Sequence, residues 1–207
     1  MVAAGAALLA AAGFSGCGSP GGVSQRATTR ATANVVQDKG LQGLILWPPK
    51  PAPALALRNY TGQPVSLATM RGRAVLVTFV YTHCPDVCPL IVADLAAAQR
   101  ELGLQARQVR IVAVTVDPHR DTPSAIRKFL AARDALGRMY YLLGTQQQLR
   151  GAWTAWDVGV TIAGKRVTVG HTASVYGITA SGHVAVVYPS NFTPEQIVHD
   201  VPRLARM

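Results

Sequence analysis

Two cysteines four residues apart are the residues of this chain best suited to chemistry. Cys84 and Cys88 lie in residues 80–89, between an apolar β-branched run at 74–79 and residues 90–96, whose apolar positions fit one stripe of a helix. The sequence therefore predicts both thiols at a strand-to-helix junction. Because the first N–H groups of a helix lack intrahelical partners and favour a thiolate over a thiol, we expect both thiols to be more acidic than free cysteine.

The spacing of the two thiols leaves two chemistries open. Residues four apart share one face of a helix, so the sulfurs can bind one metal ion or close a disulfide, although Cys-x-x-x-Cys is one residue wider than the usual redox motif. Asp86 is predicted to cap the helix, which puts Pro89 in the first turn, where a missing N–H has no cost. Two inert buried thiols are the alternative, and the proline that follows each cysteine speaks against it.

The remaining cysteine lies at the end of an apolar leader. Residues 1–16 are alanine-rich, too short to span a bilayer, and of the length of a signal-peptide core. They end in Phe14-Ser15-Gly16-Cys17, which resembles the lipobox of bacterial lipoproteins, although Phe14 replaces the usual leucine and no Lys or Arg follows Met1. The resemblance implies that Cys17 carries a lipid. The alternative is an alanine-rich leader with an incidental cysteine.

Composition narrows the classes of partner. The chain has 207 residues and a formal charge of +10. This length suits one domain with a full core plus a tail, and this charge suits an anionic partner. The arginines are scattered, however, and no short window concentrates them or interleaves them with aromatic residues, as nucleic-acid binding would require. We therefore expect a basic surface that faces a membrane or an acidic protein, and no nucleic-acid partner.

The chain divides into three predicted segments. Residues 1–17 form the signal peptide. Residues 18–53 form a flexible polar tether and an extended, proline-rich lead-in that cannot be helical. Residues 54–207 form the globular domain.

Hydrophobic periodicity predicts an α/β domain with parallel crossover units in residues 54–207. The N-terminal part has a β-hairpin around residues 59–63, and the C-terminal part has hairpins before a closing helix that starts at Thr193. After the first hairpin we expect a strand at 74–81, a helix to about 102, a strand at 109–116, a helix from 121 to about 133, a strand at 140–143 and a helix from 145 to about 156. The C-terminal hairpins are expected to consist of strands at 158–162, 166–169, 172–178 and 183–188.

Three sequence blocks, at residues 77–89, 115–123 and 170–173, resemble the signature blocks of the Sco (SenC) family. The resemblance covers about residues 54–205 in the same order. It implies a thioredoxin-like fold, with a central mixed β-sheet flanked by helices and an added β-hairpin near a ligand histidine. It also implies a membrane-anchored copper protein that takes part in the assembly of cytochrome c oxidase.

By the same resemblance, Cys84 and Cys88 match two thiolate ligands of copper and His171 matches the histidine ligand. Two thiolates and an imidazole suit Cu(I) through sulfur and tolerate Cu(II) through nitrogen, whereas structural zinc normally takes four protein ligands. Gly170 stands where the family commonly has an acidic residue, which bears on the tuning of the site. Without the resemblance, the five histidines would carry equal weight, with His83 as the local rival beside Cys84.

Other chemistry-bearing residues are expected to be structural. Asp117 and Asp121 are predicted to cap a helix and to pair with Arg120 at a strand-to-helix turn. Trp153 and Trp156, three apart on a helix, are predicted to lie in the core.

Two functions follow from these observations. The first is a copper chaperone, lipid-anchored at the extracytoplasmic face of the cell membrane, that delivers one copper ion to the copper-site subunit of cytochrome c oxidase. The alternative is a thiol-disulfide oxidoreductase that cycles Cys84 and Cys88 and is served by a thiol reductant such as a thioredoxin-like protein. Both need the thiols, and only the first needs His171.

Overall fold

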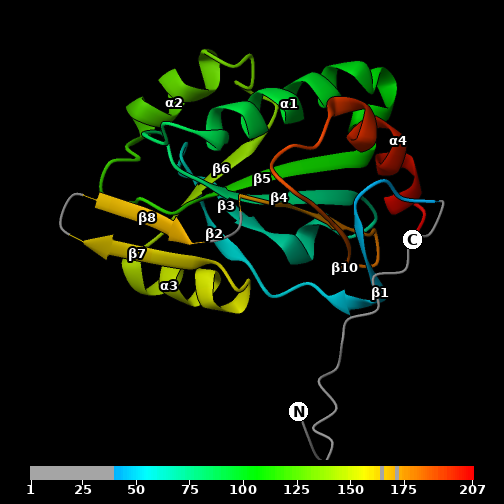
Figure 1. Ribbon diagram of the computed structural model, residues 1–207, viewed down its shortest axis with the longest axis horizontal. Coiled ribbons are helices and arrows are strands. Elements are labelled where there is room, and N and C mark those ends of the chain that lie inside the picture. Colours follow the sequence, from blue (N-terminus) through cyan, green and yellow to red (C-terminus); the bar gives the residue numbers. More distant parts are fainter. Residues whose placement is uncertain (1–39, 164–165, 171–172) are drawn as a thin grey trace, which may run out of the picture. The chain divides into compact units, whose positions relative to one another are not determined.

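A mixed β-sheet with the strand order β1-β10-β9-β4-β5-β6-β2-β3 organises the computed structural model, which describes residues 40–163, 166–170 and 173–207 (Figure 1). The strands of this sheet are β1 (Leu44–Pro51), β2 (Ala56–Asn59), β3 (Pro64–Ser66), β4 (Ala74–Val80), β5 (Val109–Thr115), β6 (Tyr140–Leu143), β9 (Val175–Ile178) and β10 (His183–Tyr188). The helices are α1 (Val87–Glu101), α2 (Pro123–Ala131), α3 (Gln146–Ala155) and α4 (Pro194–Leu204), with short 3-10 helices η1 (Leu67–Met70) and η2 (Gly103–Gln108).

Strands β4, β5 and β6 form the parallel centre of the sheet. β4 pairs with β5 along its whole length, from Ala74 opposite Val109 to Val80 opposite Thr115, and every residue of β4 is buried. A strand covered on both faces needs a continuous apolar run, which the sequence provides here. Helices α1 and α2 supply the crossovers between the parallel strands, as the alternating pattern predicted.

Alternate residues of β4 serve two separate cores. Leu76 and Val80 pack with the apolar stripes of α1, α2 and α4, whereas Val77 and Phe79 pack with α3 on the other face. Figure 1 shows α1, α2 and α4 on one side of the sheet and α3 on the other. This arrangement confirms the predicted α/β fold, with helices on both faces of a mixed sheet.

Trp153 and Trp156 lie in the core on the α3 side, as predicted, and each is 4% exposed. The indole N–H of Trp153 donates to the carbonyl oxygen of Thr115 at 3.0 Å. This hydrogen bond ties α3 to the end of β5, next to the loop that follows that strand.

A separate β-hairpin confirms the predicted addition to the fold. Strands β7 (Gly159–Ala163) and β8 (Arg166–Gly170) pair with each other, from Gly159 opposite Gly170 to Ala163 opposite Arg166. β8 ends at the residue before His171. His171 itself lies outside the described residues.

Strand β1 extends the sheet beyond the expected start of the domain. It lies within the segment predicted as an extended lead-in, and it pairs antiparallel with β10, from Leu44 opposite Val187 to Pro51 opposite His183. The sequence analysis predicted an extended chain here but not its place in the sheet. Cys17 and the rest of the leader lie outside the described residues, so the predicted segment boundaries stay predictions.

Candidate metal centre

The loop between β4 and α1 carries the cysteine pair. β4 ends at Val80 and α1 begins at Val87, so Cys88 lies in the first turn of the helix and Cys84 in the loop before it. The backbone N–H of Cys84 donates to the carbonyl oxygen of Tyr81 at 3.3 Å, which closes a turn directly after the strand. Both cysteines are free thiols, Cys84 partly exposed and Cys88 buried. The predicted strand-to-helix junction is confirmed.

Asp86 occupies the N-cap position of α1 but does not cap it. Its side chain makes no hydrogen bond to the first turn, and its φ and ψ of −122° and −111° depart from the extended backbone of capping residues. The predicted Asp86 cap is therefore wrong. Its absence leaves backbone N–H groups at this helix start available to a thiolate.

Cys84 is the acidic member of the pair. A hydrogen bond from the Cys88 thiol lowers the pKa of Cys84 to about 6, and the backbone N–H groups of Asp86 and Cys88 and the hydroxyl of Tyr81 act in the same direction, against the effect of burial. These amides belong to the start of α1, so the predicted influence of the helix terminus on Cys84 is confirmed. At neutral pH this sulfur is a thiolate.

Cys88 behaves in the opposite way. Its hydrogen bond to Cys84 and then its burial raise its pKa, and the negative charge of Cys84 adds to both effects. The prediction that both thiols are acidic is therefore wrong for Cys88. Two neighbouring thiols in a half-buried site cannot both ionise readily, because the second thiolate would face the charge of the first. The Cys88 thiol thus stays protonated and donates a hydrogen bond to the Cys84 sulfur.

Tyr81 and Arg120 flank the cysteine loop. Burial, followed by the negative charge of Cys84, raises the pKa of Tyr81 to about 12, so its hydroxyl stays protonated and donates to the Cys84 sulfur. The guanidinium carbon of Arg120 lies 6.0 Å from the centre of the Tyr81 ring. Arg120 also forms an ion pair with Asp117, as the sequence predicted.

Asp121 has a different role from the predicted cap. Its carboxylate is buried, and Thr122 is the N-cap of α2, so the predicted cap is wrong for both Asp117 and Asp121. One oxygen accepts from the backbone N–H of Thr82 at 2.8 Å and from its hydroxyl at 2.7 Å. The other accepts from Thr115 at 2.6 Å and from Tyr141 at 2.8 Å.

The four hydrogen bonds of Asp121 join the cysteine loop to β5 and β6. They compensate the burial of the carboxylate, because a buried charge needs hydrogen-bond partners for its lone pairs. They also fix the loop residue two positions before Cys84. The sequence analysis missed this role, although the polar Thr115 and Asp121 at the end of an apolar strand were a signal for buried hydrogen bonding.

The described histidines do not join the cysteines. The ring of His83 pairs through Nδ1 with the Thr82 hydroxyl at 2.9 Å, and His119 is exposed on the loop after β5. Within residues 40–163, 166–170 and 173–207, no group of three His, Cys, Asp or Glu side chains is arranged to hold a metal ion. The two sulfurs are thus the soft ligands that the described part of the chain brings together, and His171 is untested.

Comparison with known proteins identifies the family. The family model SCO1/SenC matches residues 51–206, most of the chain and nearly all of the described domain. The chain belongs to the SCO1/SenC family. The resemblance inferred from the three sequence blocks is therefore confirmed.

Individual Sco proteins are similar over most of the chain. Protein SenC of Rhodobacter capsulatus is 30% identical over 199 residues, covering 86% of this chain and 89% of SenC. The structure of Bradyrhizobium japonicum ScoI with copper bound is 28% identical, with a TM-score of 0.65, and covers 73% of this chain and 97% of ScoI. BsSco is a member of the Sco family of cytochrome c oxidase assembly proteins in which a disulfide switch has been identified. Its structure is 26% identical, with a TM-score of 0.64, and the match covers 77% of this chain and 95% of BsSco.

The alignments with some curated relatives are shorter. They span 64% of the length of a Stutzerimonas stutzeri protein and 60% of the mouse mitochondrial SCO2 homolog.

Proposed function

We propose that this Sco protein is a copper chaperone that binds one copper ion through Cys84, Cys88 and His171. It delivers the ion to the copper-site subunit of cytochrome c oxidase. The observation that carries the proposal is the pair of reduced sulfurs at the start of α1, one of them a thiolate at neutral pH. The copper bound by ScoI and the assembly role of BsSco support the choice of cargo and recipient.

The donor set fits copper better than harder ions. Thiolates are soft ligands that favour Cu(I), and an imidazole extends the site to Cu(II). The nearby carboxylates are already engaged, Asp121 by four hydrogen bonds and Asp117 by Arg120. Metal binding displaces the Cys88 proton, so affinity rises with pH. Three protein ligands leave a position at which a recipient's ligand can attack.

The position of His171 in the chain supports its assignment. The hydroxyl of Thr78 in β4 donates to the carbonyl oxygen of Ser174 at 3.0 Å, and both residues are buried. His171 is three residues from Ser174, a reach of at most about 10 Å. Thr78 in turn lies two residues before the end of β4, from which the cysteine loop departs.

The test is an anaerobic copper titration of the reduced protein and its His171→Ala variant. We expect one copper ion per chain, and a sulfur-to-copper charge-transfer band for Cu(II) that the variant loses. Copper affinity of the variant should fall by more than the about 10- to 100-fold that loss of an outer partner costs. His83→Ala and His119→Ala are the matched controls and should bind copper as the parent does. Unchanged binding by His171→Ala would refute the ligand assignment.

A second candidate function uses the same sulfurs without copper. In an oxidoreductase the Cys84 thiolate attacks a substrate disulfide, forms a mixed disulfide and releases the first substrate thiol. Cys88, losing its proton, then attacks the Cys84 sulfur and releases the second substrate thiol. Two electrons leave the pair as its own disulfide forms. The unequal pKa values of the two thiols favour this division of roles. A thioredoxin-like reductant would restore the thiols. Ready disulfide formation without tight copper binding would select this function.

Membrane anchoring is part of the proposal. Within the described residues, no helix is long and apolar enough to cross a bilayer. We propose that a lipid on Cys17 holds the protein at the extracytoplasmic face of the cell membrane, as the lipobox-like sequence indicates.

A further inference from the structure

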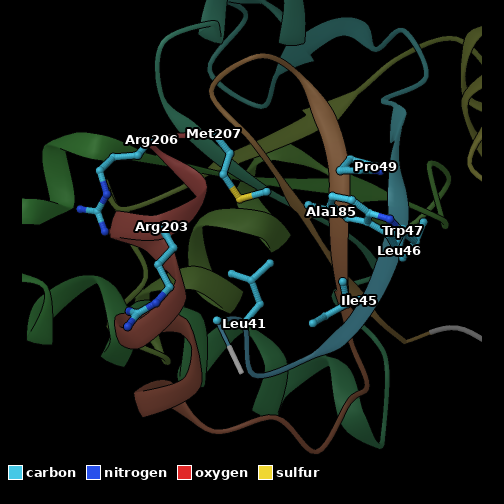
Figure 2. Close-up of a pocket in the computed structure, with 10 residues that line it drawn as sticks. Leu41, Ile45, Leu46, Trp47, Pro49, Ala185, Arg203, Arg206 and Met207 are labelled. Atoms are coloured by element: carbon cyan, nitrogen blue, oxygen red, sulfur yellow. The ribbon is translucent and has the colours of Figure 1, made fainter. Parts of the chain in front are cut away.

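An apolar groove lies between β1 and the C-terminal end of α4. Its volume is about 320 Å³. Figure 2 shows Trp47, Leu46 and Pro49 of β1 on one side, Arg203 and Arg206 on the other, and Leu41 and Met207 between them.

The rim of this groove exposes large apolar side chains. Trp47, which lines the groove, is 65% exposed, and Leu44, which does not line it, begins the same strand and is 53% exposed. An exposed tryptophan combines an apolar ring with a hydrogen-bond donor, and for this reason tryptophan is enriched where one end of a side chain is apolar and the other wet, as at membrane–water interfaces. Trp153 and Trp156 are each only 4% exposed, so Trp47 differs from the other tryptophans in its contact with solvent.

Positive charge lines one side of the groove. The guanidinium of Arg203 donates to the carbonyl oxygen of His199 at 2.5 Å, which holds it on the last turns of α4, and Arg206 follows it. Lys50, which follows the lining residue Pro49 in β1, is also exposed. No Asp or Glu side chain is among the described residues that line the groove. Cations beside an apolar surface suit anionic lipid headgroups, whose phosphates guanidinium groups bind in a fork geometry.

The chain enters the described domain at this groove. Gly40, the first described residue, is part of its lining. Residues 18–39 separate Gly40 from Cys17, a span of at most about 75 Å. A lipid on Cys17 would therefore keep the groove close to the bilayer, and tethering makes even a weak contact effective. This step rests on the anchoring proposed above.

We propose that this groove face, formed by β1 and by Arg203 and Arg206 of α4, docks onto an anionic membrane surface with Trp47 at the headgroup level. The entry of the chain and the exposed tryptophan favour a lipid surface over a protein partner.

The sheet register gives the docked domain an orientation. Lys50 pairs with Val184, Val184 with Ile178, and Ile178 with Val75 near the start of β4. The cysteine loop follows the other end of β4, about 20 Å away along the strand. Docking through the groove would thus direct the two thiols away from the bilayer.

The test measures tryptophan quenching in the full-length, metal-free protein reconstituted into vesicles whose acyl chains carry bromine. Vesicles contain either phosphatidylglycerol or phosphatidylcholine, and co-flotation reports anchoring separately. We expect Trp47 emission to be quenched in phosphatidylglycerol vesicles and less in phosphatidylcholine. Replacing both arginines, Arg203→Gln with Arg206→Gln, should lower the docking equilibrium constant about tenfold or more, because each basic residue near an anionic surface contributes about 1 kcal/mol.

Two controls test the specificity of the contact. The charge-matched pair Arg127→Gln with Arg150→Gln changes exposed arginines of α2 and α3 and should leave the quenching unchanged. The double variant Trp47→Phe with Leu90→Trp moves the exposed tryptophan to the cysteine end of the domain, where Leu90 is 59% exposed at the start of α1. Quenching of the exposed tryptophan should be lost in this variant, because that end faces away from the bilayer.

Several outcomes would overturn the proposed docking, and they distinguish a failure of docking from a failure of the lipid anchor. Co-flotation without quenching of Trp47 would overturn docking and leave the anchor intact. Loss of co-flotation would overturn the anchor and the docking that rests on it. Equal quenching in both lipids, or equal quenching at position 90, would overturn the anionic docking face. Trp47 emission that is already blue-shifted without lipid and insensitive to bromine would mean that protein covers the groove, and would overturn the proposal.

Discussion

Cys84 and Cys88 acquire different acidities from one short loop. Cys84 receives hydrogen bonds from Cys88, from two backbone amides and from Tyr81, whereas Cys88 is buried and faces the charge of Cys84. One sulfur is thus ready to attack or bind, and the other holds a proton that leaves when a metal ion or disulfide forms. The same asymmetry serves both candidate functions.

The first prediction concerns the pH dependence of Cys84. Alkylation of the reduced, metal-free protein by iodoacetamide, followed by peptide mass spectrometry, should show Cys84 reacting before Cys88, with a midpoint near pH 6. Cys88→Ala removes the strongest hydrogen bond to the thiolate and should move this midpoint upward. The urea-unfolded protein is the control, because both thiols should react there with the midpoint of free cysteine.

The lowered pKa of Cys84 also makes the free energy of unfolding depend on pH. Because the folded-state pKa of Cys84 lies below its ordinary value, its ionisation stabilises the fold at alkaline pH, and this contribution is lost as the pH falls through about 6. Cys88→Ala should weaken this dependence. A Cys84 alkylation midpoint near the ordinary thiol value of about 8.5 in the unaltered protein, which Cys88→Ala does not change, would contradict the assignment.

At the scale of elements, the close contact of β9 with β10 and α4 depends on a glycine. A methyl group on Gly177 would lie 2.4 Å from a methyl carbon of Val186 and 3.2 Å from one of Leu204. Gly177→Ala should therefore lower the free energy of unfolding by about 1–3 kcal/mol, measured by urea denaturation.

Gly151 in α3 provides the matched control. Nothing lies within 4 Å of a methyl group added there. Gly151→Ala should raise the free energy of unfolding by about 0.5–1 kcal/mol, because alanine loses less backbone entropy in a helix. Equal losses in both variants would argue against the packing explanation.

Local signals account for the elements that the sequence predicted well. The β-branched runs of β4 and β5 give strands whose ends agree with the expected ones within a residue. Thr145 and Thr193 each cap a helix where the sequence predicted its start, whereas Thr122 caps α2 in place of the predicted aspartates. Hairpins were marked by turn residues between short apolar runs.

The sequence could not predict features that depend on distant contacts. The pairing of β1 with β10 joins residues far apart in the chain, and the prolines of β1 hide its strand character. The role of Asp121 depends on Tyr141 from another strand. The raised pKa of Cys88 depends on how deeply the helix start is buried. His171 was assigned by family resemblance alone, and its ligand role stays a prediction.

At the scale of the whole molecule, β1 belongs to the folding unit. Ile45 of β1 is 7% exposed, and the backbone N–H of Gln42 donates to the buried carboxylate of Asp200 at 2.8 Å. A chain that begins at residue 54 should therefore lose about 3–5 kcal/mol of unfolding free energy relative to one that begins at residue 40. Urea denaturation of the two chains measures the difference. Equal stabilities would show that the sheet does not need β1.

The two outer strands of the sheet have a consequence for proteins crowded on a membrane. Unpaired strand edges are templates for aggregation, and proline and lysine on an edge prevent a second chain from adding to it. β1 carries Pro48, Pro49, Lys50 and Pro51, and β3 at the other edge has three residues and begins with Pro64. Neither edge offers a long row of free N–H groups. With the proposed Cys17 anchor in place, many copies can therefore gather at one bilayer without joining edge to edge into fibrils.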